Sequence, residues 1–173
     1  MKGMVDVGRK GKTHRSARAN GVVRLKEGVL RLIKEGRVPK GDVLESARVA
    51  GILAAKRTSE LIPHCHNIAI EFVGVEFKIQ KGRIEIETEV RAHAKTGVEM
   101  EALAACAISS LTIYDMCKMF DRAIVIEKIY LKEKRGGKSD TRQGVTLSKD
   151  TGPLSIGLER EGLKERFFGF ASE

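Results

Sequence analysis

The amino-acid sequence predicts an α+β fold, a ferredoxin-like sandwich whose antiparallel sheet carries its helices on one face. Three observations support it. Segments with helical periodicity and segments with period 2 follow one another in the order β-α-α-β-β-α-β. The segment from Arg83 to His93 alternates apolar or small residues with polar ones, as a half-buried strand does. A helix over residues 99–119 carries no charge from Ala102 to Tyr114, which indicates a core element.

The first half of the chain is predicted to contain an arm, a short strand and two helices. Gly36 is suited to ending the first helix, Asp42 to capping the second, and Pro63 prevents the second from continuing. The expected elements are an irregular basic arm over residues 1–19, a strand from Gly21 to Leu25, and helices from Glu27 to Glu35 and from Val43 to Leu61.

The second half supplies the rest of the sheet and the uncharged helix. A turn at Gln80-Lys81-Gly82 separates two strands, and a further strand follows the helix. From Glu133 onward the chain becomes polar. The expected strands are Ile68 to Ile79, Arg83 to His93 and Ala123 to Leu131, within a single domain over residues 1–140; residues 141–173 form a polar tail of unassigned role.

The uncharged helix has an unusual pair of charges near its end. At 100° per residue, Asp115 and Lys118 fall within about 60° of Met100, Ala104 and Leu111, so they share a face with apolar residues. Burial of that face would make the charges costly unless they pair or have a function. Two interpretations remain open: a structural ion pair at a helix end, or an acid–base pair in an active site.

The first turn of this helix carries two carboxylates. Glu99 and Glu101 suit the positive end of the helix dipole, and Thr96 stands three residues before Glu99, the spacing of a capping box. Taken alone, these residues indicate capping.

The charge of the chain is unevenly distributed. The net charge is +9, of which residues 1–57 contribute +10 and residues 58–173 contribute −1. A basic first third indicates an anionic partner, such as a nucleic acid, a phosphorylated small molecule or an acidic membrane surface, although a solvated basic face is the alternative. The low aromatic content of 5% disfavours a single-strand nucleic-acid binder.

Targeting and cysteine patterns indicate a cytoplasmic protein. The N-terminus lacks the apolar core of a signal peptide, and the longest uncharged run is too short to span a bilayer. Cys106 and Cys117 would lie about 16 Å apart along one helix, too far for a disulfide. Free thiols in a reducing compartment are the expected state.

Two loops contain candidate site residues. His64-Cys65-His66 resembles a metal cluster, but adjacent residues in an extended segment point to opposite sides, so no metal site is expected. His66 is instead a candidate for acid–base or phosphate contact. Lys40 precedes the helix that Asp42 caps, where an anion is favoured.

Taken together, these segments resemble the cyclic pyranopterin monophosphate synthase family, the molybdenum cofactor biosynthesis C proteins. The resemblance covers about residues 4–139. The matching motifs are Met4-Val-Asp-Val7, Lys40-Gly-Asp-Val43, Ala47-Arg-Val-Ala-Gly51, Ala54-Ala-Lys-Arg-Thr58, Leu61-Ile-Pro63, Cys65-His66, Lys95-Thr-Gly-Val-Glu-Met-Glu-Ala-Leu103, Leu111-Thr-Ile-Tyr-Asp-Met-Cys-Lys118 and Gly136-Gly-Lys-Ser139.

The resemblance implies an enzyme. The family is a lyase that converts 3′,8-cyclo-7,8-dihydroguanosine triphosphate, made from GTP by an upstream radical S-adenosylmethionine enzyme, to cyclic pyranopterin monophosphate and pyrophosphate. It implies a hexamer built as a trimer of dimers, with active sites between subunits and no partner nucleic acid or membrane. It requires no cofactor, and leaves open a divalent cation such as Mg²⁺ at the phosphates.

The resemblance also implies roles for particular residues. Asp115 and Lys118 match the central acid–base pair, and Lys40 and His66 are expected to join them in catalysis. The residues expected to bind substrate are Lys10, Arg15, Cys65, His66, Glu99, Met100 and Glu101. The chain departs from the family pattern at His64 and Asn67, beside His66. A basic nucleotide- or nucleic-acid-binding module without catalysis is the main alternative, and a purely structural oligomer the third.

Overall fold

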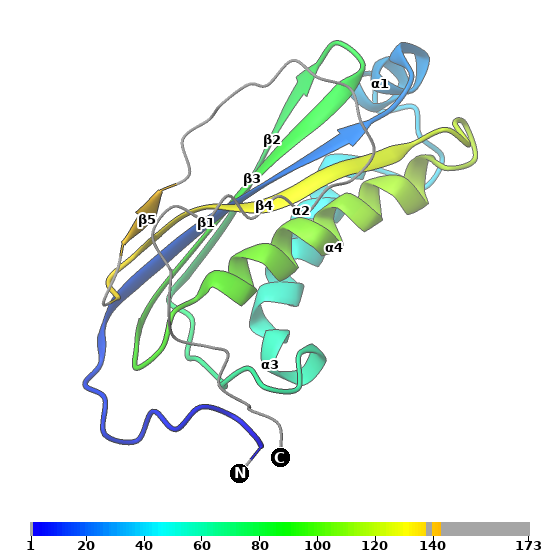
Figure 1. Ribbon diagram of the computed structural model, residues 1–173. Helices are drawn as coiled ribbons and strands as arrows, with labels where there is room; N and C mark the ends of the chain where they lie inside the picture. Colours follow the sequence, from blue (N-terminus) through cyan, green and yellow to red (C-terminus); the bar gives the residue numbers. More distant parts are fainter. Residues whose placement is uncertain (1, 138–139, 143–173) are drawn as a thin grey trace, which may run out of the picture.

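The computed structural model describes residues 2–137 and 140–142, and these form one sheet with its helices on one side (Figure 1). The strands stand in the order β2-β3-β1-β4-β5, and every pair of neighbours is antiparallel. The four long strands thus have the ferredoxin-like order, which confirms the predicted fold class. The elements are β1 (Thr13–Arg24), α1 (Glu27–Lys34), α2 (Val43–Lys56), α3 (Thr58–Leu61), β2 (Phe72–Gln80), β3 (Arg83–Ala94), α4 (Glu99–Cys117), β4 (Val125–Arg135) and β5 (Thr141–Arg142).

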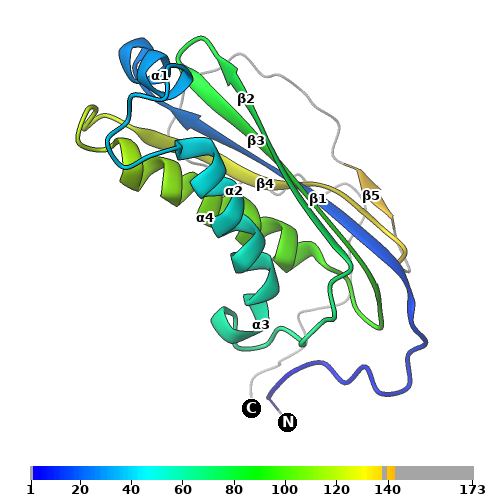
Figure 2. The same cartoon turned by 180° about the vertical axis from the view of Figure 1, so that it is seen from behind.

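The core lies between the sheet and the helices. In β3 the predicted alternation is confirmed, since Ile84, Ile86, Thr88, Val90 and Ala92 are all buried. Thr88 donates its hydroxyl to the carbonyl oxygens of Ala102 (2.8 Å) and Ala19 (3.3 Å), so a polar side chain is satisfied inside the core. Seen from behind in Figure 2, the helices again lie on one side of the sheet.

Gly51 on α2 and Ser109 on α4 let these two helices pack closely. A Cβ added at Gly51 would lie 3.0 Å from the carbonyl oxygen of Ala105 and would also meet the Ser109 hydroxyl. Ser109 donates that hydroxyl to the carbonyl oxygen of Ala47 at 2.9 Å. The two helices are therefore held both by close backbone approach and by a buried hydrogen bond.

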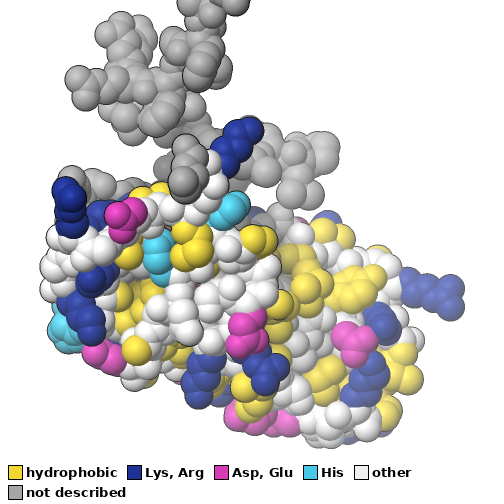
Figure 3. Space-filling view, turned by 90° about the horizontal axis from the view of Figure 1, so that it is seen from below, with side chains coloured by type: hydrophobic (Ala, Val, Ile, Leu, Met, Phe, Trp, Pro, Cys, Tyr) yellow, Lys and Arg dark blue, Asp and Glu magenta, His cyan; other side chains and the backbone are white. Residues whose placement is uncertain are grey.

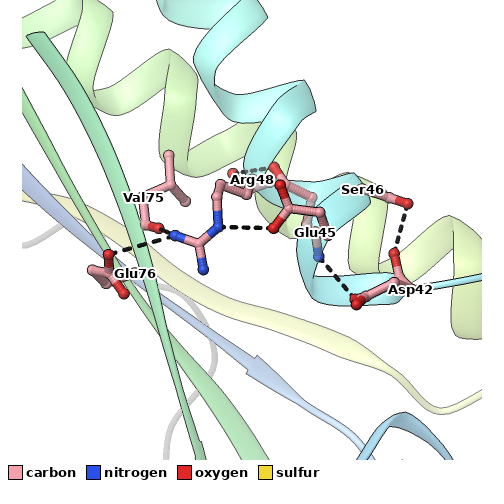
Figure 4. A network of polar contacts seen from close by, with 8 residues as sticks. Asp42, Glu45, Ser46, Arg48, Val75 and Glu76 are labelled. Atoms are coloured by element: carbon pink, nitrogen blue, oxygen red, sulfur yellow. Dashed lines mark hydrogen bonds and ion pairs between the residues drawn. The ribbon is translucent and has the colours of Figure 1, made fainter. Parts of the chain in front are cut away.

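Polar contacts fix the start of α2 (Figure 4). Asp42 caps the helix as predicted, because its Oδ1 accepts from the backbone N–H of Glu45 at 2.9 Å. Arg48 donates to the backbone carbonyl of Val75 and pairs with Glu45 at 3.2 Å, which ties the helix to β2. These contacts set the position of the loop that carries Lys40.

Several predicted boundaries are wrong. β1 begins at Thr13 and not at Gly21, so only residues 2–12 of the expected arm are irregular among those described. The helix predicted from Val43 to Leu61 is divided at Arg57 into α2 and α3. β2 begins at Phe72 rather than Ile68, and β4 runs from Val125 to Arg135 rather than ending at Leu131. The short β5 was not predicted, and the rest of the predicted tail lies outside the described residues.

Pairing with neighbouring strands explains why β1 begins earlier, and why β4 ends later, than the sequence predicted. β1 is the central strand and pairs with β3 along its whole length, from Thr13 opposite Ala94 to Arg24 opposite Arg83. β4 pairs with β1 as far as Arg135 opposite Ser16. Backbone hydrogen bonds from a distant strand thus extend both strands beyond what their basic, polar side chains indicate.

The apolar α4 packs as a core helix. By length and composition it is the one helix in the described part of the chain that could cross a membrane, but half of that stretch is buried inside the protein. Its buried side faces the sheet and α2, and includes Ala102, Ala105, Cys106 and Ile113.

Candidate active site

The C-terminal end of α4 carries a cluster of three charged side chains, which we call the lysine–aspartate cluster: Lys40, Asp115 and Lys118. Lys118 Nζ lies 2.6 Å from Oδ1 of Asp115, one turn away on the same helix. Lys40 Nζ lies 2.8 Å from Oδ2 of the same carboxylate and 3.0 Å from the backbone carbonyl oxygen of Asp115. Both carboxylate oxygens are therefore held by ammonium groups.

This geometry shifts the proton affinities of the cluster. Hydrogen bonds from Lys118 and then Lys40 lower the pKa of Asp115 to about 2, from an ordinary value of 3.8. The Asp115 carboxylate in turn raises the pKa of Lys118 above its usual value. At neutral pH, the Asp115 carboxyl group of this cluster is therefore ionised.

In a single chain the face of α4 that carries these charges is exposed. The side chains of Asp115 and Lys118 are each 55% exposed, and Leu111 on the same face is 52% exposed. The sheet and α2 bury the other sides of α4, since the helix is apolar almost all round. The periodicity located a face of the helix correctly, but could not tell which of its apolar faces meets the core.

The loop before α2 brings Lys40 to α4. Gly41 has a φ of +101°, a left-handed conformation that suits glycine, and its N–H bonds to the carbonyl oxygen of Val38 at 2.9 Å. Asp42 then caps α2. With the loop fixed in this way, the lysine reaches Asp115, a protein carboxylate, at the position where the sequence indicated an external anion.

A basic pocket lies at the opposite end of α4. It has a volume of about 430 Å³ and is formed where β1, β4, the arm and the β3–α4 loop meet. We call it the cationic pocket, and its charged lining residues are Lys10, Arg15, Lys95, Glu99, Lys134 and Arg135. Five cations and one carboxylate make the site strongly attractive to a polyanion. Figure 3 shows the molecule from below, where Lys and Arg side chains are spread over the surface among acidic, histidine and hydrophobic side chains.

The pocket contains three residues that the sequence predicted and three that it did not. Lys10, Arg15 and Glu99 were expected to bind substrate, and they line this one pocket. Lys134 and Arg135 were missed because the strand was expected to end at Leu131. Lys95 is the first residue of the matching motif that ends at Leu103, and it directly precedes the turn into α4. Its place in that motif could have identified it as a site residue.

Local contacts hold the pocket walls. Lys134 Nζ lies 3.3 Å from Oε1 of Glu99, which links β4 to the first turn of α4. Lys95 donates to the backbone carbonyl of Gly8 at 2.9 Å and so fixes the arm. The predicted capping box is wrong: the N-cap of α4 is Val98, with no side-chain cap, and Glu99 pairs with Lys134 instead.

The first turn of α4 also contains a buried carboxyl group, that of Glu101. Glu101 is 3% exposed, and its burial, with the charge of Glu99, raises its pKa. Burial and the negative charge of Glu101 likewise raise the pKa of the half-buried Cys65 thiol, which places Cys65 beside this turn. His66 is the next residue and is also half-buried, whereas Met100 is exposed.

Within the described residues, no group of three or more His, Cys, Asp or Glu side chains is arranged to hold a metal ion. The functional groups of the candidate site are therefore the lysine and arginine cations, the carboxyl groups and the Cys65 thiol.

The candidate residues fall into two groups. Asp115 follows Glu99 by 16 positions of one helix, which is about 24 Å at 1.5 Å per residue. One group is the lysine–aspartate cluster, and the other is the cationic pocket, which includes Glu99 of the first turn of α4. In one chain the two groups do not meet.

The fold and these groups define a class: an α+β protein of ferredoxin-like topology with a strongly basic pocket and a separate lysine–aspartate cluster. The chain belongs to the MoaC family, whose model matches residues 4–137.

Curated relatives agree with this assignment. A protein of Novosphingobium aromaticivorans is 52% identical over 138 residues, 80% of this chain and 88% of its own. One of Peptoclostridium acidaminophilum is 49% identical over 136 residues, 79% and 87% of the two chains. One of Thermomicrobium roseum is 53% identical over 140 residues, 80% and 84% of the two chains. Each is named cyclic pyranopterin monophosphate synthase.

Proposed function

We propose that this protein is a cyclic pyranopterin monophosphate synthase. The lyase would convert 3′,8-cyclo-7,8-dihydroguanosine triphosphate to cyclic pyranopterin monophosphate and pyrophosphate in molybdenum cofactor biosynthesis. The observation that supports the proposal is the cationic pocket, which gathers five cations around the motif residue Glu99. Relatives about half identical bear this enzyme's name.

The pocket suits the triphosphate and the pyrophosphate leaving group. In the phosphate step, a sugar-derived hydroxyl oxygen bonds to the α-phosphorus, the bond from that phosphorus to the pyrophosphate oxygen breaks, and the hydroxyl proton passes to a base. Negative charge grows on the departing oxygen, and in this proposal Lys10, Arg15 and Lys134, which line the pocket, neutralise it. Charge-assisted hydrogen bonds to phosphate are about twice as strong as neutral ones.

The lysine–aspartate cluster suits the ring rearrangement, which needs several proton transfers. Because Asp115 is ionised in the free protein and has no proton to donate, the two lysines are the proton donors of the cluster in this proposal. Asp115 positions them, and becomes a better base when a substrate phosphate draws one ammonium group away. His66 remains a candidate for a further proton transfer.

Both groups are needed on one bound molecule, so we propose that the enzyme acts as a homo-oligomer, a hexamer in the form of a trimer of dimers. The reacting hydroxyl and α-phosphate belong to the same substrate, yet the two groups of one chain lie about 24 Å apart along α4. A second subunit that supplies the missing group resolves this separation.

Other parts of the proposal follow from the family. The enzyme acts in the cytoplasm, downstream of a radical S-adenosylmethionine enzyme that cyclises GTP, without nucleic acid or membrane. The chemistry uses side chains and requires no cofactor. Adding Mg²⁺ or EDTA to the assay tests whether a divalent cation assists the phosphates.

The experiment supplies purified 3′,8-cyclo-7,8-dihydroguanosine triphosphate and measures pyrophosphate and pterin formation. The wild-type protein should turn over, and Asp115→Asn should lose at least about 100-fold in kcat, the scale of a lost acid–base group. Lys56→Ala, an exposed lysine at the end of α2, is the matched control and should stay active. A folded wild-type protein without turnover, or a fully active Asp115→Asn variant, would refute the proposal.

A further inference from the structure

The arm that precedes β1 forms a turn beside the cationic pocket. Oδ1 of Asp6 accepts a hydrogen bond from the backbone N–H of Gly8 at 2.7 Å. The N–H of Lys10 donates to the carbonyl oxygen of Val7 at 3.1 Å. These two bonds make residues 6–10 one compact turn, and Lys10, its last residue, lines the pocket. The turn therefore brings a lysine to the pocket from outside the sheet.

Lys95 connects this turn to the body of the protein. Its Nζ donates to the carbonyl oxygen of Gly8, in the middle of the turn, at 2.9 Å. Among the residues that the structure describes, this is the one hydrogen bond that joins residues 2–10 to the rest of the chain. The loop that carries Lys95 lies beside the start of β1, since Thr13 stands opposite Ala94 (Figure 1). A single ammonium group thus sets the position of the arm.

The same ammonium group also lines the cationic pocket. A lysine has three N–H donors, and the Gly8 carbonyl uses one of them, so two are left for an anion. Lys134, another cation of the lining, pairs instead with Glu99 on α4. A polyphosphate bound in the pocket would therefore share the Lys95 ammonium group with the arm.

We propose that Lys95 is a positioning residue that couples the binding of a polyphosphate to closure of the arm. The anion attracts the ammonium group, the Gly8 carbonyl moves with it, and the turn brings the positive charge of Lys10 onto the anion. Closure also excludes water, which strengthens each charge-assisted contact. The polyphosphate is the substrate's triphosphate or the released pyrophosphate. Its identity rests on the proposed function, whereas the coupling itself can be tested with pyrophosphate alone.

Hydrogen exchange of the arm tests the coupling. Exchange of a peptide that covers residues 5–12 is measured by mass spectrometry in the free protein and at saturation with pyrophosphate, set from the Kd of each variant. In the wild type, pyrophosphate should slow this exchange at least about fivefold. In Lys95→Met it should leave the arm unchanged, and Lys95→Arg, which keeps a charged donor, should regain the protection.

A matched lysine and two outcomes make this measurement decisive. Lys81→Met, at an exposed position in the β2–β3 turn, is the control and should show the wild-type protection. No protection in the wild type, or equal protection in Lys95→Met and the wild type, would overturn the coupling.

A double-mutant cycle separates coupling from simple addition of charge. Calorimetry gives the Kd of pyrophosphate for the wild type, Lys95→Met, Lys10→Gln and the double variant. In the wild-type background, Lys10→Gln should raise the Kd about tenfold or more, the effect of losing one charged hydrogen bond. In the Lys95→Met background it should raise the Kd less than about twofold, because the arm no longer brings Lys10 to the anion. Losses that multiply would mean that the two lysines act independently, and would overturn the proposal.

Asp6 offers a test in which charge and coupling predict opposite signs. Its carboxylate does not line the pocket, but it holds the turn through Gly8. Removal of a negative charge near a basic pocket by itself favours an anion. We expect Asp6→Ala instead to raise the Kd of pyrophosphate about threefold or more, because the turn loses one of its two hydrogen bonds. Tighter binding by this variant would mean that the turn is not needed for anion binding.

These measurements separate the coupling from the proposed function, since none of them requires turnover. Arm protection by pyrophosphate in a wild-type protein without turnover supports the coupling and refutes the function. Wild-type turnover with an arm that pyrophosphate does not protect refutes the coupling and leaves the function standing. Circular dichroism of each variant shows that it is folded before binding is measured.

Discussion

Lys40 Nζ lies 2.8 Å from Oδ2 of Asp115, although 75 positions separate the two residues. The same ammonium group donates to the backbone carbonyl of Asp115 at 3.0 Å, so the loop before α2 is attached to the last turn of α4. Lys118 contacts the other carboxylate oxygen, Oδ1, so each oxygen of Asp115 is paired with one lysine. The contact therefore positions the two lysines and keeps Asp115 ionised in the free protein.

Removing one of these lysines should raise the pKa of Asp115. We expect Lys40→Ala to move that pKa from about 2 toward 3.8, because one of the two ammonium groups that stabilise the carboxylate is lost. The measurement is a ¹³C NMR titration of the Asp115 carboxyl carbon. Lys56→Ala is the control and should leave the titration unchanged.

The same pKa shift gives the sign of a pH effect on stability. A folded-state pKa below the unfolded value stabilises the folded protein above pH 3.8, and the stabilisation is lost as the pH falls toward 2. The difference in free energy of unfolding between wild type and Lys40→Ala should shrink across that window. Because Asp115 is exposed, the difference is small. A difference that grows on acidification would contradict this assignment.

Local patterns predicted much of the fold. The alternation of β3, the first helix and the uncharged α4 follow from periodicity and from breakers such as Gly36, whose φ is +65°. The true start of β1 and end of β4 depend on the strands beside them. No property of Thr13 or Arg135 alone marks a strand end, so their inclusion could not be deduced locally.

In the candidate site, too, local spacing predicted some contacts, whereas others depend on tertiary structure. The i, i+3 spacing of Asp115 and Lys118 predicted an ion pair, and the structure contains it. The approach of Lys40 to that pair is a tertiary contact made by a loop, and periodicity gives no information about it. Lys134 reaches the cationic pocket because β4 is longer than its apolar pattern indicates.

Lys134 should contribute to phosphate affinity. It lines the cationic pocket and is held by Glu99 at 3.3 Å. We expect Lys134→Gln to raise the inhibition constant of pyrophosphate by about 10- to 100-fold, since a hydrogen bond from a charged group contributes about 1.5–3 kcal/mol. Isothermal titration calorimetry with pyrophosphate measures the same loss directly.

A matched lysine serves as the control for this change. Lys128 lies on the same strand, outside the cationic pocket and over the ring of Tyr130, so Lys128→Gln should leave pyrophosphate binding within about twofold of wild type. Equal losses from the two variants would mean that overall charge, rather than the pocket, attracts the anion.

Close packing of α2 on α4 should make Gly51 sensitive to a single added methyl group. In Gly51→Ala the new Cβ would lie 3.0 Å from the carbonyl oxygen of Ala105 and 3.3 Å from Cγ2 of Val75. Overpacking of this kind costs about 1–3 kcal/mol, to be measured by urea denaturation. Gly28→Ala in α1 meets nothing within 4 Å and should be neutral or stabilising. Equal stability of the two variants would show that α2 and α4 can shift enough to accommodate the added methyl group without a cost in stability.

The last prediction concerns the buried carboxyl group of Glu101. Burial raises its pKa from 4.5, and the negative charge of Glu99 raises it further. The folded protein therefore binds the proton more tightly than the unfolded chain does. Stability from this group falls as the pH rises from 4.5 through the folded-state pKa, and above that pKa the ionised carboxylate costs a constant amount.

Glu101→Gln removes this ionisation while keeping the shape of the side chain. We expect the variant to be more stable than wild type at pH 7 and to show a flatter dependence of unfolding free energy on pH above 4.5, measured by urea denaturation at several pH values. Glu60→Gln, at an exposed position in α3, should change neither quantity. A less stable Glu101→Gln variant at pH 7 would mean that the free protein uses the ionised carboxylate as a structural hydrogen-bond acceptor, and that its burial carries no cost.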